Sequence, residues 1–142
     1  MEKLVRDIMK IGVPTCSRDD KLPKVAQIMA RENADAIIVM DEFGSCGVIS
    51  QTDLVHAYPR NVQMLSAGEL MTEKIITVEP ETPVTTAASI MQDEKVHQVF
   101  IMHEHPGPSR PSAVLTMRAI VRDIAGLKPE RPEMKKPVRK SG

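Results

Sequence analysis

The chain has 142 residues, of which 42% are hydrophobic and 27% charged, values typical of one globular domain or of two small halves that share a core. Nineteen basic residues balance nineteen acidic ones and only three side chains are aromatic, which argues against general binding of nucleic acid. The charged stretch 2–7 and a longest apolar run of only 36–40 predict neither a signal peptide nor a membrane span. With two cysteines and no disulfide framework, we expect a reduced, cytoplasmic protein without a membrane partner.

An internal repeat organises most of the chain. A shift of 62 residues places Ile28-Met29 on Ile90-Met91 and the apolar run 37–40 on the run 99–102. The match breaks at a longer loop in the second copy and resumes at a shift of 66, with 48–50 on 114–116. We therefore expect two copies of one structural unit, as in other repeat architectures.

Each copy predicts the same order of elements: strand, helix, strand, strand, helix. The first helix of each copy is expected after an N-cap, at Asp20 and at Thr82, with Pro83 at the first helical position of the second copy. The last helix of each copy is expected to begin at Ser50 and at Thr116. The expected strands are, in chain order, 15–16, 36–40, 47–49, 75–78, 98–102 and 113–115.

These elements predict an α/β fold in which two βαββα repeats pack sheet to sheet about a pseudo-twofold axis. A unit of about 60 residues is marginal alone, because it buries a small share of its surface. The repeats are expected at 4–60 and 61–126, and two related clefts should form where they meet. The Pro-rich, basic tail at 127–142 is expected to be flexible.

The junction Gly47-Val48-Ile49-Ser50-Gln51-Thr52-Asp53 closes the first hairpin and starts a helix. Its pattern of Gly, two apolar residues, Ser or Thr, two residues and Asp, inside a tandem repeat, resembles the CBS domain pair, or Bateman module, over residues 4–126. The resemblance implies a regulatory and usually dimeric protein that binds adenosine nucleotides or related adenosyl ligands between the repeats. No nucleophile with a matching base is recognisable, so we expect no enzymatic activity.

Ser50 and Asp53 are the candidate ligand contacts of this motif. Ser50 is placed to cap the helix that starts at Gln51, whose free N–H groups and dipole favour a phosphate. Asp53, one turn into the helix, can accept hydrogen bonds from both ribose hydroxyls, as acidic residues do in dinucleotide folds. The same pair also fits a plain helix cap, and the repeat context favours the ligand role.

The resemblance implies that both copies complete this cleft, with Ile75 and Ile76 around the base and further contributions from Val48, Thr52, Val96 and His97. The stretch 95–98 is similar to the segment of the AMP-activated protein kinase gamma subunit in which a His contacts phosphate. A nearby anion would favour the protonated imidazole of His97 in that role. The alternative is a strand-edge histidine bonded to a neighbouring carbonyl.

The second cleft departs from the pattern. Ala119 stands at the position that matches Asp53, and Asp35 stands at the position that matches His97. A carboxylate at Asp35 would repel phosphate, although Arg118, two residues after Thr116, can hold an anion. We therefore expect one good site, at Asp53, and one degraded or repurposed site.

The sequence thus predicts a sensor that requires no cofactor and binds AMP, ADP, ATP or S-adenosylmethionine at Asp53. Binding would signal to an unknown effector protein by a conformational change in a homodimer. One alternative is a nucleotide-independent structural or interaction dimer with eroded clefts, since Ala119 already lacks the acidic group. Another is a metal-responsive module that uses His103 and His105, in a loop that otherwise reads as a solvated surface segment.

Overall fold

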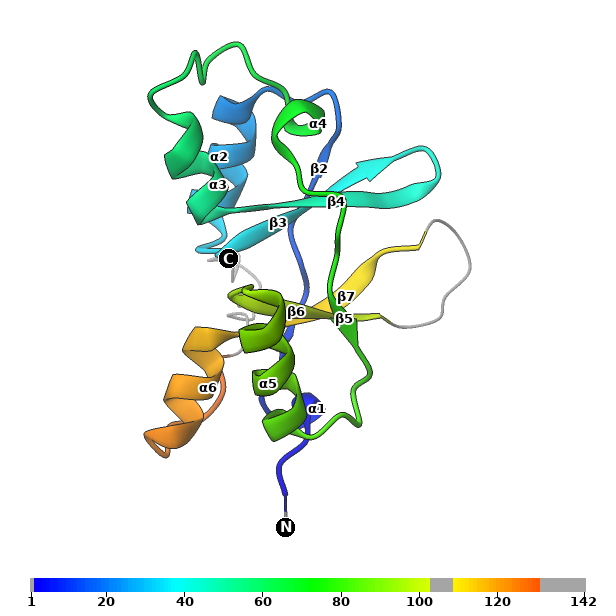
Figure 1. Cartoon of the computed structure of the whole chain (residues 1–142), viewed down its shortest axis with the longest axis vertical. Coiled ribbons are helices and arrows are strands. Elements are labelled where there is room, and N and C mark those ends of the chain that lie inside the picture. Colours follow the sequence, from blue (N-terminus) through cyan, green and yellow to red (C-terminus); the bar gives the residue numbers. More distant parts are fainter. Residues whose placement is uncertain (1, 103–108, 131–142) are drawn as a thin grey trace, which may run out of the picture.

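The computed structural model describes residues 2–102 and 109–130, which fold into two β-sheets that pack against each other (Figure 1). Helices cover the outer face of each sheet, so that each half of the molecule has a core between its sheet and its helices. The expected order of strand, helix, strand, strand, helix is present in both repeats and is confirmed.

The first sheet has the strand order β2-β3-β4. Its strands β2 (Thr15–Ser17) and β3 (Ala36–Asp41) are parallel and are joined by α2 (Leu22–Arg31), since parallel neighbours need a crossover connection. Strand β4 (Gly44–Ser50) returns antiparallel to β3 and runs into α3 (Gln51–Ala57). The second sheet repeats this arrangement with β5 (Thr77–Val78), α5 (Val84–Glu94), β6 (Gln98–Met102), β7 (Pro111–Thr116) and α6 (Met117–Ile124).

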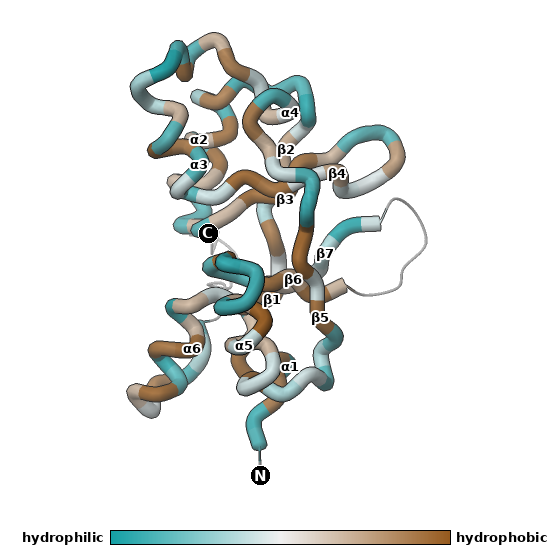
Figure 2. Tube along the Cα trace, in the orientation of Figure 1, coloured by the Kyte–Doolittle hydropathy of each residue, from teal (hydrophilic) through white to brown (hydrophobic). Residues whose placement is uncertain are grey.

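The central strands are buried on both faces. In β3, Ile37 and Val39 pack toward the helices of the first half, whereas Ala36 and Ile38 pack toward the second sheet. Phe100 of β6 lies in the same cluster between the sheets and is only 1% exposed. Figure 2 accordingly shows β3 and β6 as apolar segments in the middle of the molecule. Burial on both faces explains why these strands have no alternating polar positions.

The first segment of the chain packs on the second half of the molecule. Helix α1 (Val5–Ile8) buries Val5 and Ile8 in the core between the second sheet and its helices. Strand β1 (Lys10–Ile11) adds an antiparallel edge strand to β7, which gives the second sheet the order β1-β7-β6-β5. The predicted repeats, 4–60 and 61–126, are consecutive in the sequence. However, α1 and β1, which belong to the first repeat by sequence, pack with the second sheet.

The start of the second repeat makes the reciprocal exchange. Helix α4 (Ala67–Leu70) buries Ala67 in the core of the first half, and Thr72 exchanges two backbone hydrogen bonds with Val48 of β4. Figure 1 shows α4 beside α2 in one half and α1 beside α5 in the other. Each core therefore needs side chains from both repeats.

The predicted N-cap at Asp20 is wrong by one residue. Helix α2 begins after Lys21, and no side chain caps it. Its first N–H, on Leu22, instead donates to the backbone oxygen of Leu65 at 2.9 Å. Leu65 belongs to the segment 65–72 of the second repeat, which packs on the first half and is called an exchanged segment, as is 3–11 of the first repeat. The Asp20 carboxylate closes the preceding turn by accepting from the Ser17 N–H at 2.8 Å.

The predicted N-cap at Thr82 is wrong for the same reason. Helix α5 begins after Pro83, which is the N-cap residue itself, and no side chain caps this helix either. The first N–H of α5, on Val84, donates to the backbone oxygen of Lys3 at 2.9 Å. Backbone oxygens of the exchanged segments thus do the work that capping side chains do in most helices.

Candidate functional site

The two clefts between the repeats begin at equivalent junctions, where β4 runs into α3 and β7 runs into α6. Ser50 and Thr116 are the N-caps, as predicted, and each side chain accepts a hydrogen bond from the third N–H of its helix. The first N–H of α3 donates to the Asp35 backbone oxygen at 3.0 Å, and that of α6 donates to the His97 backbone oxygen at 3.1 Å. These bonds tie each helix start to the turn before the central strand.

Asp53 forms a capping box with Ser50. Its Oδ2 accepts from the Ser50 N–H at 2.8 Å and from the Ser50 hydroxyl at 3.0 Å, and Ser50 Oγ lies 3.3 Å from the Asp53 nitrogen. The side chain of Asp53 is half-buried. Both bonds to the carboxylate use Oδ2, so Oδ1 retains its capacity to accept from a ligand. The capping role and a ligand role are compatible at this residue.

The other residues predicted for this cleft lie in three different environments: between the sheets, in the core of the second half, and on the surface. Val48 and Ile75 are brought together in the apolar cluster between the two sheets. Ile76 and Val96 pack against the core of the second half. Thr52 and His97 are exposed.

Gly47, the first residue of the motif, has a packing role. A Cβ built at this position would lie 2.4 Å from Met71 Sδ, closer than real Cβ contacts, and 3.0 Å from Met71 Cβ, which is a tight contact. Any larger residue here would have to displace the Met71 side chain, because the end of α4 lies directly over β4. This part of the motif is thus explained by the exchange of segments rather than by a ligand.

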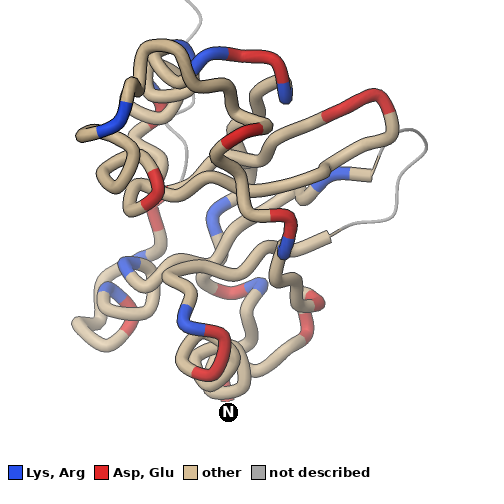
Figure 3. Tube along the Cα trace, turned by 45° about the horizontal axis from the view of Figure 1, so that its top comes forward, with Lys and Arg blue, Asp and Glu red and all other residues tan. Residues whose placement is uncertain are grey.

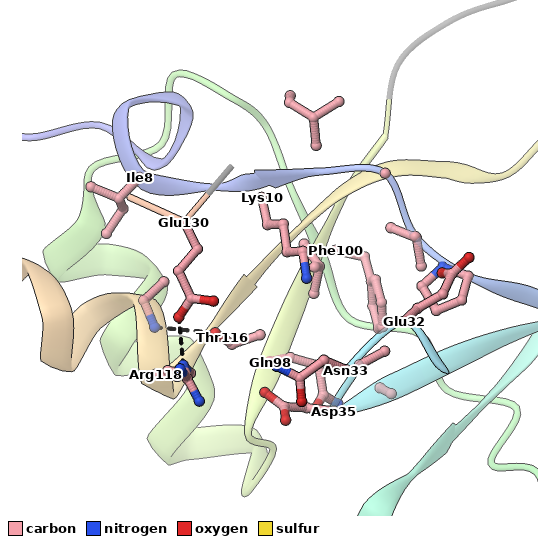
Figure 4. A pocket seen from close by; sticks show the side chains of 18 of the residues that line it. Ile8, Lys10, Glu32, Asn33, Asp35, Gln98, Phe100, Thr116, Arg118 and Glu130 are labelled. Carbon is pink, nitrogen blue, oxygen red and sulfur yellow. Dashed lines mark hydrogen bonds and ion pairs between the residues drawn. The ribbon is translucent and has the colours of Figure 1, made fainter. Parts of the chain in front are cut away.

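A cavity of about 780 Å³ opens in the second cleft, which the sequence analysis expected to be degraded (Figure 4). It lies between the start of α6, the end of α2 and the β1–β2 segment. Every residue predicted for the Asp53 cleft has its repeat mate in the lining of this cavity, in the same order: Val114, Thr116, Arg118, Ala119, Val13, Pro14, Ala34 and Asp35. The pseudo-twofold axis therefore relates the predicted site to a cavity of ligand size.

One end of this cavity is basic and is occupied by a side chain of the same protein. Arg118 Nε donates to Glu130 Oε1 at 2.5 Å, Arg122 Nε lies 3.6 Å from the same oxygen, and Lys10 lines the same region. The hydrogen bond from Arg118, together with the charges of Arg118, Arg122 and Lys10, lowers the pKa of the Glu130 carboxyl below its ordinary value. Glu130 is therefore ionised at neutral pH.

Sequence reasoning missed this contact, because the segment from 127 onward was expected to be flexible. In the structure Arg122 Nη2 donates to the Lys128 backbone oxygen at 2.9 Å, which holds the chain against α6 and directs Glu130 into the cleft. Glu130, one of two acidic residues in a tail with six basic ones, was the signal available. The remainder of that tail, 131–142, lies outside the described residues.

The other side of the cavity is polar. Asn33, Asp35 and Gln98 gather there in Figure 4, away from the pair of Arg118 and Glu130. Gln98 is only 6% exposed, and its Oε1 has no hydrogen-bond partner in the described part of the chain. A buried amide oxygen without a donor is costly, so this atom marks a position where a ligand or a water can donate.

The comparison with known proteins identifies the family. A model of the CBS domain matches residues 5–60 and 67–126, which is most of the chain. The chain belongs to the CBS-domain family. The resemblance noted from the Gly47–Asp53 junction is confirmed, and CBS domain pairs are generally regulatory modules rather than enzymes.

Solved CBS structures share the fold. The CBS domain pair of protein MJ0100, described in complex with 5′-methylthioadenosine and S-adenosyl-L-methionine, superimposes with a TM-score of 0.78 at 24% identity, over 89% of this chain and 98% of that one. A hexameric CBS-CP12 protein from bloom-forming cyanobacteria gives 0.74 at 16% identity, over 85% of this chain and 67% of that one.

Curated relatives by sequence are longer proteins. The mitochondrial CBS domain-containing protein CBSX3 of Arabidopsis thaliana is 26% identical over 116 residues, which are 76% of this chain and 56% of that protein. Across the curated relatives that match, this CBS pair spans between 24% and 56% of their length. The similarity thus concerns the CBS pair and leaves the other parts of those proteins aside.

Charge and metal chemistry add little to this picture. Basic and acidic residues are interspersed along the trace of both repeats (Figure 3). Within residues 2–102 and 109–130, no three His, Cys, Asp or Glu side chains form a group suited to a metal ion. The predicted metal-binding pair His103 and His105 lies outside the described residues. None of the described helices has the length and apolar content that crossing a bilayer requires.

Proposed function

We propose that this CBS pair is a regulatory module that binds an adenosine-type ligand, of the AMP, ADP, ATP or S-adenosylmethionine class, in the cleft at Asp53. The observation that carries the proposal is the correspondence between the two clefts. The residues at Asp53 are the repeat mates of those that line the 780 Å³ cavity. Only the Asp53 cleft adds an acidic residue at the position that would face a ribose.

In this proposal, different residues of the cleft contact the ribose, the base and the phosphate of the ligand. Asp53 Oδ1 accepts hydrogen bonds from the ribose hydroxyls while Oδ2 remains in the capping box. Val48 and Ile75, from opposite repeats, offer apolar surface to the base. His97, exposed at the start of β6, donates to a phosphate or carboxylate of the ligand.

A ligand held in this way contacts both repeats, which is what allows it to act as a signal. Binding shifts the arrangement of the repeats only by the difference in affinity between two arrangements, so contacts from both sides of the cleft are needed. The adenosyl compounds named for the CBS pair of protein MJ0100 support this ligand class.

We predict that Asp53→Ala weakens binding of the ligand by at least about tenfold, since a hydrogen bond to a charged group contributes about 1.5–3 kcal/mol. The measurement is isothermal titration calorimetry of AMP, ATP, S-adenosylmethionine and 5′-methylthioadenosine, on the wild type and the variant. The wild type is expected to bind at least one of these compounds.

The control must separate ligand contact from helix capping. Glu69→Ala removes a second capping box, in which Glu69 accepts from the Ser66 N–H at 3.2 Å, without touching either cleft. It removes the same kind of reciprocal capping contact and is expected to keep full ligand affinity. The proposal fails if the wild type binds none of these compounds at millimolar concentration, or if Asp53→Ala binds as tightly as the wild type.

We also propose that the module acts as a homodimer through a face formed by α3 and α6. Val55 of α3 and Val121 of α6 occupy equivalent positions in the two repeats, and both are exposed. Tyr58 and Ile124 form a second exposed pair of repeat mates beside them. Figure 1 shows α3 and α6 on the same side of the molecule, so the apolar face is itself two-fold. Such a face suits an isologous contact with a second copy.

The double variant Val55→Glu/Val121→Glu is predicted to sediment as a monomer, because four like charges would be buried in each dimer. Sedimentation velocity on the wild type is expected to show a dimer at micromolar concentration. The control is Met64→Glu, which adds one charge at an exposed apolar residue in the loop after α3. A monomeric wild type, or a double variant that remains dimeric, contradicts this interface.

A further inference from the structure

The basic end of the second cleft is positioned to hold an anion that comes from outside the chain. We propose that Arg118, Arg122 and Lys10 form a phosphate-binding end of this cleft, that Glu130 occupies it as an internal ligand, and that a phosphate group displaces Glu130. The proposal concerns the cleft without Asp53 and stands independently of the function proposed for the other cleft.

The charge balance of the cavity supports an anionic ligand. Its lining includes four basic residues, Lys10, Arg31, Arg118 and Arg122, against three acidic ones, Glu32, Asp35 and Glu130. When Glu130 leaves, four positive charges face two negative ones. Arg118, Arg122 and Lys10 are then without the carboxylate of Glu130. A phosphate, which carries a higher negative charge than a carboxylate, is attracted to them more strongly than Glu130 is.

The geometry favours phosphate over the carboxylate that is present. Glu130 Oε1 accepts from Arg118 at 2.5 Å but lies 3.6 Å from Arg122 Nε, beyond hydrogen-bond distance. Arg122 Nε is buried and has no hydrogen-bond partner in the described part of the chain. A tetrahedral phosphate presents more acceptor oxygens in more directions than a planar carboxylate, so it can bond both guanidinium groups.

A second, independent feature of the same cavity points to a ligand. The Gln98 amide oxygen is buried on the opposite side without a donor. A phosphate ester with a hydroxyl or amino group can reach from the arginine end and donate to this oxygen. Inorganic phosphate fills only the arginine end, which makes the two probes distinguishable.

Displacement of Glu130 has a structural consequence outside the cleft. Residues 128–130 are held to α6 by two contacts, from Arg118 to Glu130 and from Arg122 to the Lys128 backbone oxygen. A phosphate that bonds Arg118 and the free Nε of Arg122 competes directly with Glu130, whereas the bond from Arg122 Nη2 to Lys128 uses a different nitrogen. Occupation of the second cleft is thereby coupled to release of Glu130 from α6.

The test follows the Arg118 Nε–Hε and Glu130 backbone signals by ¹H–¹⁵N NMR during titration with inorganic phosphate. It is run in an Asp53→Ala background, so that the other cleft does not contribute. Phosphate should shift the Arg118 signal and move the Glu130 amide toward its random-coil position. Glu130→Gln should tighten phosphate binding about two- to fivefold, the factor that corresponds to one partly exposed ion pair. Arg118→Ala should abolish the effect.

Glu42→Gln is the matched control, since it removes one exposed carboxylate on the β3–β4 hairpin, away from the cavity lining. Equal phosphate affinity in the wild type and in Glu130→Gln overturns the proposal, as does tightening of the same size in Glu42→Gln. Absence of phosphate binding in both the wild type and Glu130→Gln also overturns it. AMP is titrated in parallel. Tighter binding of AMP than of phosphate identifies a phosphate ester as the ligand, and equal binding identifies free phosphate, either of which supports the site.

Discussion

Replacing Phe100 by alanine is expected to lower the free energy of unfolding by about 3–5 kcal/mol, the usual cost for a fully buried Phe. Phe100 is 1% exposed and is the largest side chain in the cluster that joins the two sheets. Its loss leaves a cavity between Ala36, Ile38 and Val48, and β-strands on both sides limit how far the site can collapse. Chemical denaturation followed by far-UV circular dichroism measures the change.

Phe43 provides the matched control, because it is the only other phenylalanine of the chain. It lies at the tip of the β3–β4 hairpin and is 82% exposed. Phe43→Ala is expected to change stability by no more than about 0.5 kcal/mol, as surface substitutions usually do. If the two variants lose similar stability, the sheets do not pack through Phe100 as described.

The second large effect is expected at Ile8, in the segment that crosses to the other repeat. Ile8→Ala should destabilise the protein by about 2–5 kcal/mol, since this side chain is 4% exposed in the core of the second half. The more specific prediction concerns which strands lose stability. Amide hydrogen exchange should show a greater loss of protection in β6 and β7 than in β3 and β4, although residue 8 belongs to the first repeat.

Ile11→Ala serves as the comparison, since Ile11 is 57% exposed on the edge strand β1. It is expected to cost about 1 kcal/mol or less, within the range of strand propensity. A larger loss of protection in β3 and β4 than in β6 and β7 after Ile8→Ala would show that α1 packs on its own repeat, contrary to the exchange.

The exchange also explains why the clefts are well defined. Backbone oxygens of Lys3 and Leu65 receive the first N–H groups of α5 and α2, so the exchanged segments set where those helices start. The ends of α2 and α5 in turn lead into the turns before β3 and β6, which form one wall of each cleft. Each cleft therefore depends on contacts between residues far apart in the sequence, 43 positions for Leu22 and Leu65 and 81 for Lys3 and Val84.

Much of the secondary structure and the family could be predicted from local sequence patterns. The order of elements in each repeat, the hairpin of the first repeat and the caps at Ser50 and Thr116 follow from local patterns, and the structure has them as predicted. The strand expected at 75–78 is shorter and forms only at Thr77–Val78. The Gly47–Asp53 junction, placed at a strand end and inside a tandem repeat, indicated the CBS family, which the family model confirms. The caps at Asp20 and Thr82 were misplaced, because the donors at those helix starts find distant backbone oxygens instead of local side chains.

The sequence by itself determined the tandem βαββα architecture and the asymmetry between the clefts, since one carries Asp53 and the other Ala119. These properties depend on residue identity at repeat-equivalent positions, which a single sequence displays. Only the tertiary structure showed that α1 packs on the second half and α4 on the first. It also showed that a cavity lies in the cleft that has Ala119 in place of Asp53, and that Glu130 occupies the basic end of this cavity. Each of these rests on a contact between distant segments, whose free energy comes from burial and charge pairing that no local pattern encodes.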